Sequence, residues 1–194
     1  MRLGEVASIR SGLVLSRKLA KEPTEYRYRL LNLRSIHPKG YVDPDQLDVY
    51  DAKEPLGSEY LTRSGDIIVR LSAPYTAVLI DQSTENLVVS SNFVLIRTEQ
   101  NALLPEYLHW LLNTEKVNRR IYENATTNML SAVKAKYFVD FEFAQLPLEQ
   151  QRAVADMYQT MQKELRLLTE LAEEKEKYYT RAIELAQDNM KRGL

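Results

Sequence analysis

Two kinds of hydrophobic pattern divide the chain. Up to about residue 147, short apolar runs alternate with turn residues, which is typical of β-strands and short helices. From residue 149 to residue 190, apolar residues recur every three or four positions, and no Gly or Pro interrupts them. That spacing is typical of an α-helix with one apolar side. We therefore expect an α+β domain over residues 1–147, followed by one long helix over residues 148–194.

The first part contains several predicted strands and a pair of helices. The run 28–33 predicts a strand, and the Pro and Gly of residues 37–40 predict a turn. Three β-branched apolar runs, at 67–71, 76–80 and 93–97, predict core strands of one sheet, within a domain that we expect to be of the mixed-sheet type. Pro105 suits the first position of a helix, and helical spacing of the apolar residues extends from there to about residue 124.

The long C-terminal helix is predicted to carry a heptad seam. At about 1.5 Å per residue, its rod measures roughly 60 Å. The seam residues are Val154, Met157, Met161, Glu164, Leu168, Leu171, Lys175, Tyr178, Ala182, Leu185 and Asn189, of which Glu164, Lys175 and Asn189 interrupt the apolar stripe. Such a stripe packs against another helix, and we expect that helix to come from a second molecule, in an antiparallel coiled coil. The alternative is a helix that folds back over its own domain.

Composition excludes several classes of protein. No apolar run approaches the roughly 18 residues of a membrane span, and the first residues do not form a secretory signal. Without cysteine there are no disulfides and no thiolate metal ligands. The two histidines, His37 and His109, are not at a metal-ligand spacing, so we expect no metal. A cytoplasmic protein is the simplest interpretation.

The charge is near neutral but unevenly distributed. Although the net charge is -1, residues 1–39 carry nine Lys and Arg against three acidic residues, a balance of +6. Residues 40–60 reverse it with six acidic residues against one Lys, and a second basic cluster follows, consisting of Lys116, Arg119, Arg120, Lys134 and Lys136. This segregation allows a basic face on a neutral protein. The alternative is an ordinary solvated surface.

No catalytic motif emerges from the sequence. There is no phosphate-binding Gly-rich loop, no dinucleotide-binding turn and no Gly-x-Ser-x-Gly elbow. The run Ser72-Ala73-Pro74-Tyr75 shares only its end with the Asn/Asp-Pro-Pro-aromatic motif of adenine methyltransferases. Nor do the acidic residues form the cluster that a metal-dependent nuclease requires. We expect a protein that is not an enzyme.

Five stretches, taken in order, resemble the specificity subunits of type I restriction-modification systems. Residues 3–12 resemble the start of their target-recognition domains, and residues 105–108 resemble the start of their helical part. Residues 61–70, with Gly65-Asp66-Ile67, and residues 89–97 resemble two of their strands. Residues 146–155, which begin Leu146-Pro147-Leu148, are very similar to the boundary before their spacer helix. The order and spacing of these stretches make the resemblance specific.

The resemblance implies a half-subunit. The family's full subunits hold two recognition domains and two antiparallel spacer helices, whereas this chain holds one of each and is expected to pair with itself. Residues 125–129 also replace a loop that often contains glycine. The implied partners are double-stranded DNA, a methylation subunit that uses S-adenosylmethionine, and a restriction subunit in complete systems. The chain itself is expected to need no cofactor.

Candidate DNA-binding residues come from basic or amide-rich loops. They are Arg10, Arg17, Lys18, Arg70, Ser72, Tyr75, Thr76, Ser91, Asn92, Thr127, Asn128, Lys134 and Lys136. Lys and Arg would hold phosphates, whereas Asn, Ser, Thr, Tyr and also Arg on loops would contact base edges in the major groove. The expected dimer interface consists of Val154, Met157, Met161, Leu168, Leu171, Tyr178, Ala182 and Leu185, and partner subunits would dock on Arg166, Glu170, Glu173, Lys177 and Arg181. For all of these a plain surface role is the alternative.

Two other functions are consistent with the same sequence. A coiled-coil adaptor without a DNA role would explain the near-neutral charge, and a stand-alone enzyme would turn over a nucleic acid or nucleotide substrate. The salt dependence of DNA binding distinguishes the adaptor from a DNA-binding subunit, whose affinity for DNA falls steeply as the salt concentration rises.

Overall fold

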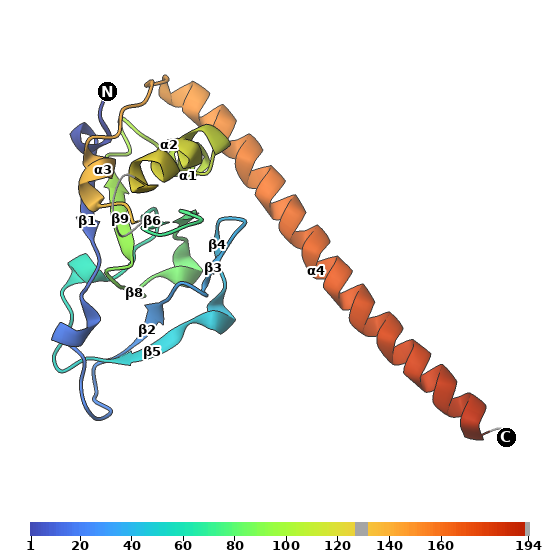
Figure 1. Ribbon diagram of the computed structural model, residues 1–194. Coiled ribbons are helices and arrows are strands. Elements are labelled where there is room, and N and C mark those ends of the chain that lie inside the picture. Colours follow the sequence, from blue (N-terminus) through green and yellow to red (C-terminus); the bar gives the residue numbers. More distant parts are fainter. Residues whose placement is uncertain (127–131, 193–194) are drawn as a thin grey trace. The chain divides into compact units, whose positions relative to one another are not determined.

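The computed structural model describes residues 1–126 and 132–192 (Figure 1). The chain divides into two units, Met1–Ala155 and Asp156–Leu194. Helix α4 (Leu148–Arg192) begins in the first unit and forms the described part of the second.

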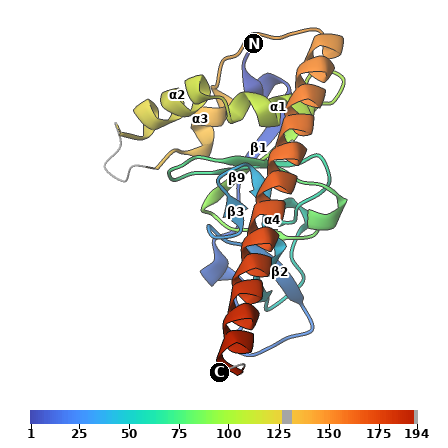
Figure 2. The ribbon, with the colours of Figure 1, turned by 90° about the vertical axis from the view of Figure 1, so that its right-hand side faces the viewer.

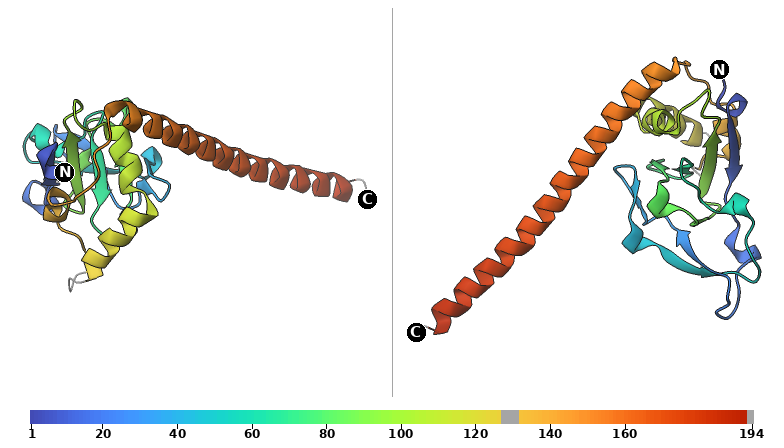
Figure 3. Two further views of the ribbon diagram at one scale, coloured as in Figure 1. Left: turned by 90° about the horizontal axis from the view of Figure 1, so that it is seen from above. Right: turned by 180° about the vertical axis from the view of Figure 1, so that it is seen from behind.

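A central antiparallel sheet organises the first unit. Its strand order is β1 (Ala7–Ser11), β9 (Phe93–Thr98), β6 (Ile67–Arg70) and β7 (Ala77–Leu79). Strands β1 and β9 come from distant parts of the sequence and lie side by side in the right-hand view of Figure 3. One row across the sheet consists of Ile9, Ile96, Ile67 and Leu79. These side chains explain why the runs pair here, since they pack well on a pleated, buried surface.

A smaller mixed sheet lies in a second layer. Strand β2 (Arg27–Leu31) pairs antiparallel with β5 (Asp48–Asp51) and parallel with β8 (Val88–Val89). A hairpin of β3 (Ile36–His37) and β4 (Tyr41–Val42) turns at Gly40, whose φ of 84° favours glycine. Short 3₁₀ helices lie in the connections, at η1 (Leu3–Glu5), η2 (Leu15–Arg17), η3 (Pro44–Gln46), η4 (Ser58–Tyr60) and η5 (Gln82–Thr84).

The central sheet separates two cores. On one face it packs against helices α1 (Pro105–Leu112), α2 (Glu115–Thr126) and α3 (Ala135–Val139), through buried residues such as Leu108 and Phe138. On the other face Ile68 and Leu95 pack against Leu31 of the second sheet. The first unit is therefore layered as helices, sheet and sheet, with α1 to α3 at the top of Figure 1 and grouped together in Figure 2.

A buried ion pair joins two of the stretches on which the resemblance rests. The Asp66 carboxylate is 2% exposed and accepts two bonds from the Arg97 guanidinium, at 2.8 Å from Nε and 3.1 Å from Nη2. It also accepts a bond from the Arg63 amide at 2.8 Å. Gly65, at a φ of 85°, provides the turn that aims Asp66 inward. The Gly-Asp-Ile stretch thus fixes the entry of β6 against β9.

Gln151 anchors the start of α4 in the core. Its amide oxygen accepts a bond from the Leu104 amide at 2.9 Å. Its amide nitrogen donates to the carbonyl oxygens of Ala102 at 3.1 Å and Leu146 at 2.8 Å. Because Gln151 is fully buried and satisfied on both atoms, it ties the first turn of α4 to the segment leading into α1.

The structure confirms most of the predicted elements. The α+β class, the three core strands of one sheet, the strand at β2, the turn after His37, the helix pair from Pro105 and the long helix are all present. The sequence patterns did not reveal β1, β5 or α3. These elements are short or largely exposed, so their periodicity is weak.

Candidate nucleic-acid interface

Three segments meet at one end of the central sheet. They are the β6–β7 loop (71–76), the turn before β9 (90–92) and the strand-like segment that leads into α3 (132–134). The Leu71 amide donates to the Asn92 carbonyl at 3.0 Å, and the Val133 amide donates to the Leu71 carbonyl at 2.9 Å. These bonds bring four of the predicted residues into one neighbourhood, namely Arg70, Ser72, Asn92 and Lys134.

Arg70 supports the β6–β7 loop from inside. Its Nη2 donates to the Ala73 carbonyl at 3.0 Å, and its buried Nε has no hydrogen-bond partner within the described residues. Burial lowers the pKa of Arg70 from its ordinary value. The backbone amide of Arg70 donates to the backbone carbonyl of Thr76, across the loop, at 3.1 Å. The side chain is therefore partly committed to holding the loop.

The two residues at the end of this loop are buried. Tyr75 is 4% exposed and Thr76 is 5% exposed, and the Tyr75 ring belongs to the core beneath the helices. Their side chains form the base of the loop. Ser72 is half-buried, whereas Ser91 and Asn92 are exposed. Of the predicted residues at this end, Ser91, Asn92 and Lys134 therefore face solvent, together with part of Ser72.

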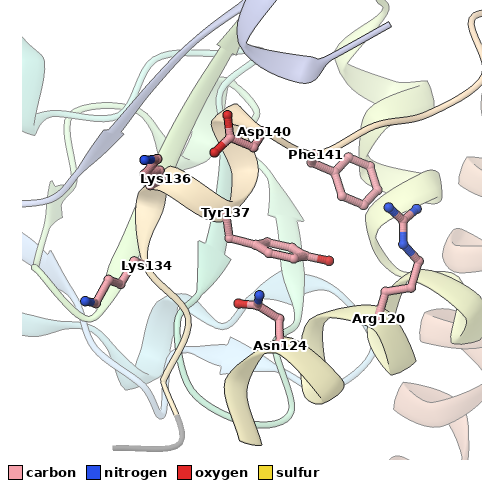
Figure 4. Close-up of a pocket in the computed structure, with 7 residues that line it drawn as sticks. All are labelled: Arg120, Asn124, Lys134, Lys136, Tyr137, Asp140 and Phe141. Atoms are coloured by element: carbon pink, nitrogen blue, oxygen red, sulfur yellow. The ribbon is translucent and has the colours of Figure 1, made fainter. Parts of the chain in front are cut away.

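A cationic pocket of about 350 Å³ lies between α2 and α3. Its walls consist of Arg120, Asn124, Lys134, Lys136, Tyr137, Asp140 and Phe141 (Figure 4). Three cations oppose the single acid Asp140, and no ion-pair partner of Lys134 or Lys136 exists within the described residues. The pocket therefore brings together the two lysines predicted from the sequence.

Arg120 and Tyr137 complete the floor of this pocket. The Arg120 guanidinium lies 4.8 Å from the centre of the Phe141 ring and donates from Nη1 to the Glu142 carbonyl at 3.2 Å. Figure 4 shows the Tyr137 ring pointing toward Arg120 and Asn124. The Tyr137 hydroxyl is buried without a hydrogen-bond partner in the described part of the chain, and burial raises its pKa. A neutral phenol beside the Arg120 guanidinium is suited to donate to an anionic oxygen.

Sequence reasoning found only part of this pocket. Arg120 stood in the second basic cluster, but Asn124 and Tyr137 were missed. Helix α2 brings Asn124 to the pocket, and α3 brings Tyr137, so the signal lies in the approach of two helices and not in any local motif.

Arg10 lies on the other face of the central sheet. Ile9 packs toward the helices, so its neighbour Arg10 points to the opposite side, opposite Leu95. The pocket lies on the helical side. Arg10 is exposed and has no ion-pair partner within the described residues, but the structure does not bring it to the pocket.

Arg17 ends η2 and Lys18 follows it directly, beside the second sheet. The Lys18 ammonium pairs with the Glu54 carboxylate, and this hydrogen bond and the opposite charge raise the pKa of Lys18. The neighbouring Leu15 carbonyl accepts a bond from the Tyr50 hydroxyl at 2.8 Å. Neither residue is brought to the pocket. The other two predicted loop residues, Thr127 and Asn128, lie outside the described residues.

A second surface of interest runs along α4. Met157, Met161, Leu168, Leu171, Tyr178 and Leu185 are exposed, and Ala182 is half-buried. Val154 differs from these, because it packs against the core of the first unit. The predicted seam is thus exposed from Met157 onward, and its pairing with a second molecule stays a prediction.

The polar faces of α4 hold local ion pairs. Arg166 bonds Glu170 at 2.8 Å, and Lys177 bonds Glu174 at 2.7 Å. Glu173 and Arg181 are exposed. Three of the predicted docking residues therefore already have partners on their own helix.

Two classes of site are missing from the part of the chain that the structure describes. It contains no group of three His, Asp or Glu side chains that could hold a metal ion. Its helices include none with the length and apolar character needed to cross a lipid bilayer.

Comparison with known proteins identifies the fold. No protein-family model matches the sequence, and no curated protein matches it. Among solved structures, an HsdS subunit from Thermoanaerobacter tengcongensis aligns with a TM-score of 0.66 and 19% identity, over 88% of this chain and 43% of that chain. A chain from a structure of the type I restriction-modification system, on its complex assembly and conformational transition, aligns with a TM-score of 0.58 and 17% identity.

The second alignment covers 87% of this chain and 39% of that chain, so this chain spans less than half the length of either protein. At identities below 20%, these two structural alignments show a shared fold and nothing beyond it. The resemblance noted in the sequence is confirmed at that level: the chain has the fold of one part of a type I restriction-modification specificity subunit.

Proposed function

We propose that this chain is a DNA-specificity subunit of a type I restriction-modification system and is not itself an enzyme. It binds a short double-stranded sequence and directs a methylation subunit, which uses S-adenosylmethionine, and in complete systems a restriction subunit, to that sequence. The observation that carries the proposal is the fold shared with an HsdS subunit over 88% of the chain.

The cationic pocket supports a contact with the DNA backbone. Lys134, Lys136 and Arg120 provide positive charge on one side of the first unit, and the Tyr137 hydroxyl adds a donor. Phosphate contacts of this kind set the register of a protein on the duplex. At the adjoining end of the sheet, the exposed Ser91 and Asn92 carry groups that can bond base edges.

The proposal includes self-pairing through α4. The exposed apolar stripe from Met157 onward supports a helix partner, and antiparallel pairing of two copies would hold two recognition domains at a fixed separation. A two-fold pair of identical readers prefers an interrupted palindrome.

Selection from a random pool of duplex oligonucleotides tests the recognition itself. The chain is incubated with the pool together with its methylation subunit, and bound molecules are sequenced. We expect enrichment of two inverted half-sites separated by a constant gap. Recovery of no common sequence would contradict the proposal.

Salt dependence tests the pocket. Replacing Lys134 and Lys136 together by Ala is expected to reduce the slope of log affinity against log salt by about two, because each phosphate contact contributes roughly 0.9. The sequence preference should remain, since the proposal assigns these lysines to phosphates and not to bases. The matched control is the Lys53→Ala, Lys191→Ala double variant, which changes the charge equally at exposed positions outside the pocket and outside the apolar seam of α4.

The exposed stripe of α4 also favours a second candidate, a coiled-coil adaptor without a DNA role. An adaptor would bind DNA weakly, without a sequence preference, and equally in both double variants. The same titrations therefore separate the two functions.

A further inference from the structure

Two charged residues interrupt the exposed apolar seam of α4. Glu164 and Lys175 occupy seam positions between Met161 and Tyr178. Both are exposed, and neither has an ion-pair partner within the described residues, although other charges of the helix are paired locally. Unpaired charges within an apolar seam are costly unless the partner helix supplies the opposite charge.

Antiparallel pairing about a two-fold axis restricts which residues can face each other. Residue i of one copy lies opposite residue j of the other when i and j add up to a constant. With the axis midway between Thr169 and Glu170, Glu164 faces Lys175 of the second copy, and Lys175 faces Glu164. The same register places Leu168 opposite Leu171, Met161 opposite Tyr178, and Met157 opposite Ala182.

We propose that the second copy pairs with α4 in this single register, fixed by two interchain Glu164–Lys175 ion pairs on either side of a central leucine cluster. The inference rests on the self-pairing in the proposed function and specifies its geometry. Beyond the exposed seam, the register also places Leu185 opposite Val154 and Asn189 opposite Gln150. Apolar residues thus face apolar residues, and polar residues face polar residues, in every layer.

Other registers oppose charges to apolar side chains. Moving the axis by half a heptad in one direction places Glu164 opposite Leu168 and Lys175 opposite Met157. Moving it in the other direction places Glu164 opposite Ala182 and Lys175 opposite Leu171. A parallel pair in register would oppose Glu164 to Glu164 and Lys175 to Lys175. Each alternative desolvates charges without compensation.

The surface near the axis is shaped to receive a side chain. Leu167, Leu168 and Leu171 line an apolar groove of about 390 Å³, whose rim carries Thr160, Lys163 and Glu164. In the proposed register the second copy brings its own Leu171 to Leu168 at this groove. Such insertion of one side chain into a hole of four is the packing unit of coiled coils.

A charge exchange tests the register. Glu164→Lys alone and Lys175→Glu alone should each weaken self-association on the order of a hundredfold by analytical ultracentrifugation, because each opposes like charges in the seam. The double variant should return to within about tenfold of the native protein. Glu173→Lys, an exposed change of the same charge off the seam, should have no effect. Single variants that associate normally, or a double variant that stays monomeric, would overturn the proposal.

Distances between spin labels provide an independent test. The chain contains no cysteine, so Gln159→Cys and Thr180→Cys each accept one label per copy. These positions lie equally far from the proposed axis, and each pair of labels should be separated along the helix by about 30 Å. A register shifted by one heptad would give roughly 40 Å at one position and 20 Å at the other, which would refute the assignment.

Failure of this inference can be told apart from failure of the proposed function. If the chain selects a DNA sequence but its labels give unequal distances, the DNA role stands and the register is wrong. If the labels give equal distances and the charge exchange behaves as expected, yet no DNA sequence is selected, the pairing stands and the specificity role is wrong.

Discussion

His109 is a buried titratable residue at the contact between α1 and the β3–β4 turn. Its Nε2 lies 3.1 Å from the Gly40 carbonyl oxygen. Since that oxygen only accepts, Nε2 carries the proton and donates. Burial lowers the pKa of His109 to about 4, despite the two backbone carbonyls that favour the charged ring. The neutral imidazole is thus part of the folded state.

This burial predicts an acid-sensitive fold. The unfolded chain binds a proton at His109 near pH 6.5, whereas the folded chain binds it only near pH 4. The free energy of unfolding is therefore highest above pH 6.5 and decreases as the pH falls toward 4. The total decrease due to His109 is about 3 kcal/mol. Urea unfolding at pH 7, 5.5 and 4.5 measures the slope. His109→Gln should flatten it, and an unchanged slope in that variant would assign the acid sensitivity to other groups.

The Asp66–Arg97 pair predicts a second large effect at a single residue. Asp66→Ala leaves the Arg97 guanidinium next to a buried site without its carboxylate and removes the acceptor of the Arg63 amide. We expect a loss of about 3 kcal/mol in the free energy of unfolding. The exposed pair of Arg34 and Asp48 offers the control, because Asp48→Ala should cost less than about 1 kcal/mol.

At the scale of elements, several of the stretches that carry the family resemblance hold one strand or helix against another. Gly12 approaches β8 and β9 so closely that a Cβ would collide with the carbonyl oxygens of Val89 and Ser90. Asp66 fixes β6 to β9, and Gln151 fixes α4 to the segment before α1. Of the residues expected to contact DNA, Arg10, Arg70, Ser91 and Asn92 lie in these stretches themselves, and the others lie between the stretches.

The hydrogen bonds of Gln151 are predicted to stabilise the first turns of α4 against the core. Gln151→Ala removes three hydrogen bonds and leaves the Leu104 amide and the Ala102 carbonyl without this partner. We expect destabilisation by about 2 kcal/mol and faster amide hydrogen exchange in the first turns of α4. The neighbouring Gln150 is exposed, so Gln150→Ala should change the free energy of unfolding by less than about 0.5 kcal/mol. It should leave the rate of amide hydrogen exchange in the first turns of α4 nearly unchanged. Equal effects at the two positions would contradict the anchoring role.

Strong local periodicity explains what could be predicted from the sequence. The apolar runs at β6, β7 and β9 and the uninterrupted helix formers of α4 contain their own structural signal. Strand β1 pairs with β9 across more than eighty residues, and α3 is a short helix placed by tertiary packing, so local patterns do not reveal them. The pocket was half predicted for the same reason, since lysines are visible in a sequence but a buried tyrosine hydroxyl between two helices is not.

At the scale of the whole molecule, α4 is predicted to determine the gap between half-sites. Inserting one complete heptad between Thr169 and Glu170, with apolar residues at its seam positions, keeps the seam nearly aligned. It should lengthen the proposed pair by roughly 10 Å. At about 3.4 Å per base pair, the selected gap should grow by about three pairs. The selection experiment repeated with this variant measures the change, and an unaltered gap would show that α4 does not set the spacing.

The proposed Glu164–Lys175 contact has one further consequence. A copy with Glu164→Lys carries two lysines in its seam, and a copy with Lys175→Glu carries two glutamates. Each repels its own kind, but each complements the other at both contacts. Two chains with different recognition loops, marked in this way, would therefore assemble only as mixed pairs. Such pairs would recognise an asymmetric bipartite target, with each half chosen separately.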